Sequence, residues 1–254
     1  MGFVRSVVAW LLLCVGFTAV STSDALGAPI PQGPDPMVAK WPHWPYPTTC
    51  GSGPAFDPVS AFSGPTEAEM GLGPAEEELR ETIKEWQTGF PTLPKHHWRM
   101  LSQEPGVVVY GHGRLPGVEE LTLEESGGLW DFAGYDSGCE PTSIVDGRQA
   151  ITWTLSSRQS PLRPGTRQLW IDLGPGECAS GMSQNDRAMK PVFFELGKRL
   201  LMVMRLRPLP PRSYTCEGTL EPPMRVKLPK RLGNFTLFDG GVYPPSRAAL
   251  PRHR

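Results

Sequence analysis

Glycine and proline interrupt this chain so often that most of it can form only short elements joined by turns. The 254 residues include 28 glycines and 29 prolines, and only residues 65–104 carry a sustained helical pattern. There Thr66 with Glu69 matches a capping box, and Gly73-Pro74 begins a run in which Leu79, Ile83 and Trp86 recur at helical spacing. Elsewhere the composition favours short β-strands, because glycine and proline are the residues that turns require.

The chain beyond the helical segment alternates apolar with polar residues, which is the period of a strand with one buried face. Residues 192–196 and 199–206 flank Gly197-Lys198 and predict a β-hairpin. We therefore expect a mainly β (α+β) fold, with an antiparallel β-sandwich-like domain over residues 105–245 and a small N-terminal helical cap. Residues 246–254 contain few apolar side chains and are expected to form a disordered tail.

The N-terminal segment has the organisation of a signal peptide over residues 1–27. Arg5 supplies positive charge, Val7 to Val20 is almost wholly apolar, and Ala25-Leu26-Gly27 offers small residues for cleavage. A membrane anchor is the alternative, but the apolar run is shorter than the roughly 18 to 20 residues that span a bilayer. We expect a secreted, extracytoplasmic protein with no transmembrane span after cleavage.

Cysteine usage agrees with export. Removing the signal peptide takes away Cys14 and leaves Cys50, Cys139, Cys178 and Cys216, which predicts two disulfides. Three connectivities are possible; we favour Cys178 with Cys216, because each follows a strand-like run in one module, and then Cys50 with Cys139. A zinc site is not expected, because the chain has no CxxC or CxxH pair.

Residues 28–64 form a segment rich in proline and aromatic side chains, predicted to be an extended arm. Two interpretations are open for Trp41, Trp44 and Tyr46, together with Tyr243 near the other end of the chain. The rings could form a ligand-binding surface that stacks on sugars or docks a partner. They could instead hold the arm over the core, helped by Cys50.

The residues that could carry chemistry do not complete a known motif. Asp136-Ser137-Gly138 has some likeness to the nucleophile segment of trypsin-like proteases, but no upstream segment supplies a base. His112 lies between two glycines and could be accessible at a strand end. A glycosidase needs two carboxyl groups about 5 to 10 Å apart, whereas adjacent glutamates on a strand face opposite sides. The carboxylates considered are Glu119, Glu120, Glu124, Glu125, Asp131 and Asp136. We expect no cofactor and no metal.

The C-terminal third has a further set of short motifs. They are Cys178-Ala179-Ser180-Gly181, Tyr214-Thr215-Cys216-Glu217-Gly218-Thr219, Val226-Lys227-Leu228-Pro229 and Asp239-Gly240-Gly241. In these motifs the chain resembles a family of uncharacterised secreted or lipid-anchored actinobacterial proteins. The resemblance implies export, a paired Cys178 and Cys216 and a β-rich domain, and it supplies no catalytic residues.

Charge limits the classes of partner. The net charge is -1 at pH 7, so a nucleic acid or an anionic membrane has no overall electrostatic support. The sequence therefore favours a non-catalytic exported protein with a binding or structural role in the cell envelope, with a cell-wall glycan or an envelope protein as partner. The alternative is a secreted hydrolase that uses acidic residues or His112.

Overall fold

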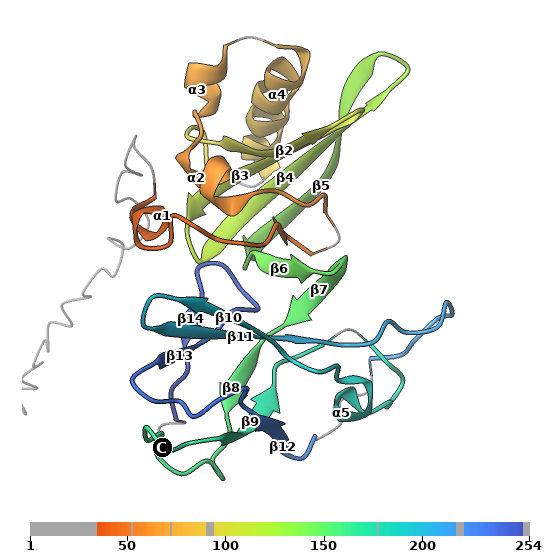
Figure 1. Cartoon of the computed structure of the whole chain (residues 1–254). Coiled ribbons are helices and arrows are strands. Elements are labelled where there is room, and N and C mark those ends of the chain that lie inside the picture. The colour runs from red at the N-terminus through yellow and green to blue at the C-terminus, as the bar shows by residue number, and fades with distance from the viewer. Residues whose placement is uncertain are drawn as a thin grey trace, which may run out of the picture.

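The computed structural model describes residues 35–51, 53–71, 73–89, 94–176, 178–216 and 221–250. It is mainly β, with a helix-covered sheet in an N-terminal lobe and two further sheets in a C-terminal lobe (Figure 1). The predicted fold class is confirmed. The predicted signal peptide lies outside the described residues. Among the helices that are described, none has the length and apolar character needed to cross a membrane.

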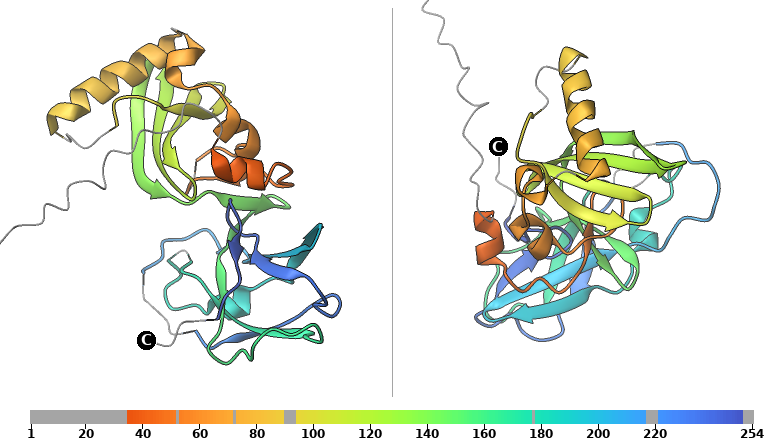
Figure 2. Two further views of the ribbon diagram at one scale, coloured as in Figure 1. Left: turned by 90° about the vertical axis from the view of Figure 1, so that its left-hand side faces the viewer. Right: turned by 90° about the horizontal axis from the view of Figure 1, so that it is seen from above.

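Four consecutive antiparallel strands form the sheet of the N-terminal lobe, and helix α4 (Pro74–Gly89) lies across one of its faces. The strands are β2 (Arg99–Glu104), β3 (Val107–Arg114), β4 (Gly117–Ser126) and β5 (Leu129–Cys139). The apolar stripe predicted for α4 is buried here, because Leu79 and Ile83 pack against alternate residues of β3 and β4 such as Tyr110 and Leu121. Register shifts within the sheet increase its twist, and Figure 2 shows the strands curling around one side.

The N-terminal arm differs from its prediction as a wholly extended segment. It contains helices α1 (Pro36–Lys40) and α2 (Pro58–Ser63), besides the short strand β1 (Thr48–Thr49). Each helix starts with an aspartate cap before a proline: a side-chain oxygen of Asp35 accepts from the Met37 N–H at 2.8 Å, and one of Asp57 accepts from the Val59 N–H at 3.1 Å. An aspartate cap followed by proline at the first helical position is a helix start signal.

The predicted helical segment, residues 65–104, is also shorter than expected. It holds α3 (Glu67–Met70), which begins with the expected Thr66 and Glu69 capping box, and then α4. Its last six residues form strand β2 instead of a helical turn. The reason is pairing: Arg99 and Met100 lie opposite Gly111 and Tyr110 of β3, and this ladder outweighs local preference.

The C-terminal lobe is built around strand β11 (Arg199–Arg205), which is buried on both faces. Leu200, Met202 and Met204 point into one core cluster, while Leu201 and Val203 point into clusters on the other side. The large sheet has the order β1-β6-β7-β11-β13-β14, and β10 pairs with β11 as the predicted hairpin. These strands are β6 (Thr142–Val145), β7 (Arg148–Ile151), β10 (Val192–Leu196), β13 (Thr236–Asp239) and β14 (Ser246–Arg247).

A smaller antiparallel sheet completes the sandwich. It contains β8 (Trp153–Leu155), β9 (Gln168–Leu173) and β12 (Met224–Lys227), and the short helix α5 (Gln184–Arg187) precedes β10. Trp153, Leu169 and Ile171 from this sheet share a core with residues of β11. The prediction of a disordered tail from residue 246 is wrong at the start of that tail, because Ser246–Arg247 pairs with β13. Residues 251–254 of the predicted tail lie outside the described residues.

Both favoured disulfides are confirmed. Cys178 and Cys216 join with a Cα–Cα distance of 4.3 Å, and Cys50 and Cys139 join with a Cα–Cα distance of 5.5 Å. The second bond ties the N-terminal arm to the last residue of β5.

Candidate functional site

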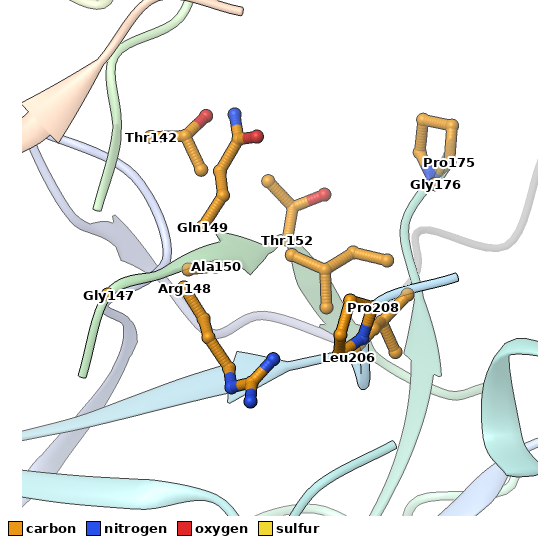
Figure 3. Close-up of a pocket in the computed structure, with 11 residues that line it drawn as sticks. Thr142, Gly147, Arg148, Gln149, Ala150, Thr152, Pro175, Gly176, Leu206 and Pro208 are labelled. Atoms are coloured by element: carbon orange, nitrogen blue, oxygen red, sulfur yellow. The ribbon is translucent and has the colours of Figure 1, made fainter. Parts of the chain in front are cut away.

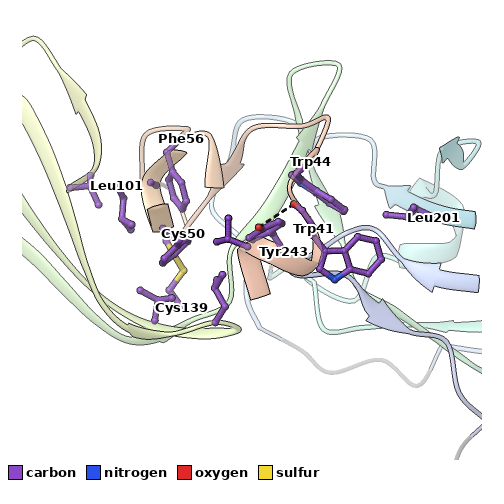
Figure 4. Close-up of a cluster of buried hydrophobic side chains, with 14 residues drawn as sticks. Trp41, Trp44, Cys50, Phe56, Leu101, Cys139, Leu201 and Tyr243 are labelled. Atoms are coloured by element: carbon purple, nitrogen blue, oxygen red, sulfur yellow. Dashed lines mark hydrogen bonds between the residues drawn. A yellow bond between two sulfur atoms is a disulfide. The ribbon is translucent and has the colours of Figure 1, made fainter. Parts of the chain in front are cut away.

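The aromatic residues of the arm are part of the core. The exposed fractions are 1% for Trp41, 8% for Trp44 and 0% for Tyr243, while Tyr46 is half-buried. Figure 4 shows Trp41, Trp44 and Tyr243 gathered in one cluster that also includes Leu201 of β11. The ligand-binding surface predicted for these rings is therefore wrong, since buried rings cannot stack on a ligand.

The packing explains why the rings turn inward. Trp44 contacts Tyr243 edge to face with ring centroids 5.4 Å apart, and Trp41 contacts Phe238 in the same way at 5.1 Å. Tyr46 packs against Trp44 and Phe194, each with ring centroids 6.3 Å apart. The arm covers the face of β11 that would otherwise expose Leu201. The other interpretation, an arm held over the core, is the one confirmed.

Carboxylates instead gather on the face of the N-terminal sheet that α4 does not cover. A cavity of about 620 Å³ opens there between β4, β5 and the loop after Cys50. We call it the acidic groove, because its lining includes Glu104, Glu120, Glu124 and Asp136. Strand alternation places Glu120 and Glu124 on this face, since Leu121 and Leu123 point toward α4.

Glu120 is the most perturbed member of the acidic groove. Its side chain is only 8% exposed, and its Oε2 accepts no hydrogen bond from any described residue. Burial raises the pKa of this carboxyl to about 7, and the negative charge of Asp136 adds to the rise, while a hydrogen bond with Thr122 opposes it. Asp136 lies directly opposite Glu120 in the antiparallel ladder of β4 and β5. Perturbed carboxyls of this kind are typical of functional sites.

The loop from Cys50 to Pro54 closes over Glu120. A Cβ atom at Gly53 would lie 3.3 Å from Oε1 of Glu120 and 3.1 Å from the carbonyl oxygen of Cys50, so a glycine allows this close approach. One carboxylate oxygen of Glu120 and the Sγ atoms of Cys50 and Cys139 lie within 4.8 Å of one another. This is the one such group of potential metal ligands found in the described chain, and its sulfurs are bonded to each other, so they are not thiolate ligands.

His112 lies on the opposite face of the same sheet, under Trp98 with ring centroids 5.5 Å apart. Its Nδ1 is 3.5 Å from Oε2 of Glu119. Burial lowers the pKa of His112 to about 4, with a further contribution from His97, and burial raises the pKa of Glu119. The sheet therefore separates His112 from the acidic groove, and a hydrolase could not use both.

The strand register rules out a serine-protease triad at Ser137. Glu119 lies opposite both His112 of β3 and Ser137 of β5, so the carboxylate stands between the serine and the histidine. A catalytic triad requires the histidine between the serine and the carboxylate. Two of the carboxylates considered, Asp131 and Glu125, do not line the groove. In the ladder Asp131 lies opposite Glu124, and Glu125 lies opposite Trp130.

A second cavity, of about 430 Å³, lies in the C-terminal lobe beside β7 (Figure 3). Its lining from the described chain includes Arg148, Gln149 and Thr152 and contains no carboxylate or histidine. It offers no acid–base pair, so the acidic groove is the stronger candidate.

Comparison with known proteins supplies no further assignment: no protein-family model matches the chain, and no curated protein and no solved structure is significantly similar to it.

Proposed function

We propose that this is a non-catalytic exported protein of the cell envelope that binds a cationic side chain of a partner protein in the acidic groove. The observation that carries the proposal is the buried carboxyl of Glu120, whose Oε2 has acceptor capacity that no described residue uses. A guanidinium or ammonium group would satisfy that oxygen and neutralise the surrounding carboxylates. Two disulfides support a location in an oxidising compartment outside the cytoplasm.

The size and lining of the groove favour an organic cation over a bare metal ion. An opening of about 620 Å³ accommodates a long side chain, and Val107 offers apolar surface along its stem. Arginine suits such a site because its planar fork binds a carboxylate through two parallel hydrogen bonds.

Calorimetric titration with tetra-arginine peptide tests the proposal. We expect binding by the wild-type protein, and at least about tenfold weaker binding by Glu120→Gln and by Asp136→Asn, because each removes an acceptor charge from the groove. Glu125→Gln is the matched control, since this glutamate is exposed on β4 outside the groove, and it should bind as the wild type does. Binding of CaCl2 without binding of the peptide would contradict the proposal.

A hydrolase acting through Glu120 and Asp136 is the second candidate, because two opposed carboxyls with one raised pKa resemble an acid–base pair. Directly opposed cross-strand residues have Cβ atoms roughly 4.5 to 5.5 Å apart, so the two carboxyl groups are neighbours, as the pair in a glycosidase must be. Release of nitrophenol from aryl glycosides by the wild type but not by Glu120→Gln would favour this candidate over the first.

A further inference from the structure

The far end of the C-terminal lobe carries a cationic cavity that neither the sequence motifs nor the acidic groove explains. The loop before β9 lines an open cavity of about 740 Å³ together with the start of that strand. We call it the arginine pocket. Its lining includes Arg158, Arg163, Arg167, Thr166, Gln168 and Trp170. Figure 1 shows β9 at the opposite end of the molecule from α4.

The backbone that carries these arginines is held in place by a buried glutamine. Gln159 is 9% exposed; its Oε1 accepts from the Trp170 N–H at 2.7 Å, and its Nε2 donates to the Ser160 carbonyl at 2.7 Å. Farther along the loop, Thr166 Oγ1 accepts from the Arg163 N–H at 3.0 Å. These hydrogen bonds fix the loop backbone against the sheet, so the positions from which its cationic side chains extend are fixed as well.

The same face of the small sheet adds more positive charge. Arg225 and Lys227 of β12 lie opposite Trp170 and Gln168 in the ladder. Arg225 donates to Oε1 of Gln168, and its guanidinium carbon lies 5.9 Å from the centre of the Trp170 ring.

The arginines of the pocket lack acidic partners within the described chain. None of the ion pairs found there includes Arg158, Arg163 or Arg167. The chain as a whole has a net charge of -1, so this concentration of cations is a local feature and not a consequence of composition. Like charges gathered without counter-charges repel one another, and an anionic ligand would relieve that repulsion.

We propose that the arginine pocket binds an anionic carbohydrate polymer. Guanidinium groups recognise carboxylate and phosphate oxygens through paired hydrogen bonds, and three of them line the pocket. The half-buried Trp170 supplies an aromatic surface for the apolar face of a sugar ring. The cavity is open to solvent, so a ligand longer than one sugar can extend beyond it.

Two other polyanions fit less well. Proteins that bind single-stranded nucleic acids stack successive bases on several aromatic rings, whereas Trp170 is the one aromatic side chain in the described lining. Binding to a membrane surface usually buries apolar side chains beside the cations. The large hydrophobic side chains exposed in the described chain are Leu129 and Leu250, and neither lines the pocket.

Titration with an oligogalacturonate, followed by calorimetry over a series of salt concentrations, tests this proposal. We expect binding that weakens as salt rises, and a loss of roughly tenfold or more in Arg158→Gln/Arg163→Gln/Arg167→Gln, since each removed charge takes away an ionic contact. The matched control, Lys198→Gln/Arg212→Gln/Arg247→Gln, removes three exposed cations outside the pocket and should bind as the wild type does.

Circular dichroism and thermal unfolding of both triple variants establish that they fold. Equal losses in the two triple variants would overturn the proposal, because binding would then depend on total charge. It would also be overturned by absent binding, by equal binding of a neutral maltodextrin, or by tighter binding of a single-stranded oligonucleotide or of phosphatidylglycerol vesicles. Because Glu120→Gln leaves this pocket unchanged, its binding to oligogalacturonate should match the wild type, so failure of one proposal is distinguishable from failure of the other.

Discussion

At the scale of single residues, burial shifts the pKa values of Glu120 and His112 in opposite directions. Glu120 is buried beside a negative charge and holds its proton to about pH 7, whereas His112 is buried under an indole and stays neutral down to about pH 4. Both shifts come mainly from removing a charged form from water. Each therefore predicts a distinct dependence of stability on pH.

Glu120→Gln should become more stable relative to the wild type as pH rises. In the wild type the unfolded chain releases the Glu120 proton above its usual pKa of 4.5, while the folded protein keeps it until about pH 7. The folded state therefore loses stability between those values, by up to about 3 kcal/mol. Urea unfolding of both proteins at pH 5 and pH 8 measures the difference, and Glu125→Gln should follow the wild type. A constant difference between Glu120→Gln and the wild type would contradict the assigned pKa.

His112→Phe should show the opposite trend. The unfolded chain binds a proton at this histidine below the usual pKa of 6.5, but the folded protein does so only near pH 4. The wild type therefore loses stability as pH falls through this range, by up to about 3 kcal/mol. Phenylalanine removes that loss, so the variant should gain stability relative to the wild type at pH 4.5. Equal unfolding free energies of the two proteins across the range would show that His112 titrates normally.

At the scale of elements, one extra residue in β5 creates the acidic groove. Pairing outward from the turn after β4 places Ser126 opposite Leu129 and Leu123 opposite Phe132. The register then shifts, and Glu120 lies opposite Asp136. Continuation of the first register would have placed Tyr135 opposite Glu120 instead. A β-bulge thus sets which two side chains share this part of the groove.

The arm loop is the second element that defines the groove, and the Cys50–Cys139 disulfide holds it there. Replacing both cysteines by alanine should lower the unfolding free energy by roughly 4 kcal/mol, because the bond closes a long loop in the unfolded chain. It should also weaken tetra-arginine binding by freeing the loop over Glu120. Removing Cys178 and Cys216 is the control: it should cost stability and leave that binding unchanged. Equal peptide binding by the two double variants would show that the Cys50–Cys139 disulfide is not needed to form the groove.

At the scale of the whole molecule, the arm joins the two lobes through one core cluster. The cluster includes Val109 and Val118 of the N-terminal sheet. It also includes Trp41 of the arm and Leu201 of β11, which Figure 4 shows. Arg199 of β11 adds a guanidinium 4.1 Å from the Trp41 ring centre and donates to the Lys40 carbonyl at 3.0 Å. The lobes should therefore unfold together.

Trp41→Ala should uncouple them. Truncation of a buried tryptophan costs about 3 to 5 kcal/mol, and here it removes the side chain that connects the arm to Phe238 of β13. We expect one calorimetric transition in the wild type and two in the variant. Leu129→Ala, at a side chain that is 71% exposed, should keep the single transition. A single, lowered transition in Trp41→Ala would mean that other contacts suffice to couple the lobes.

Local patterns were enough for much of the fold. The stripe on α4, the Thr66 capping box and the hairpin at Gly197-Lys198 follow from spacing within a few residues, and the structure has all three. The mainly β class follows from the same short-range signals. The favoured cysteine pairs were also correct, although spacing alone left three connectivities open.

The direction of the arm and the identity of the site depended on contacts between residues far apart in the chain. The local sequence around Trp41 and Trp44 is compatible with rings that face either the solvent or the core. The rings face the core because they cover the face of β11 that carries Leu201. The sequence correctly implied that Glu119 and Glu120 point to opposite sides, but it contained no signal for the bulge that aligns Asp136 with Glu120. Backbone periodicity is a local property, whereas burial and strand register are set by the partner that each strand meets in three dimensions.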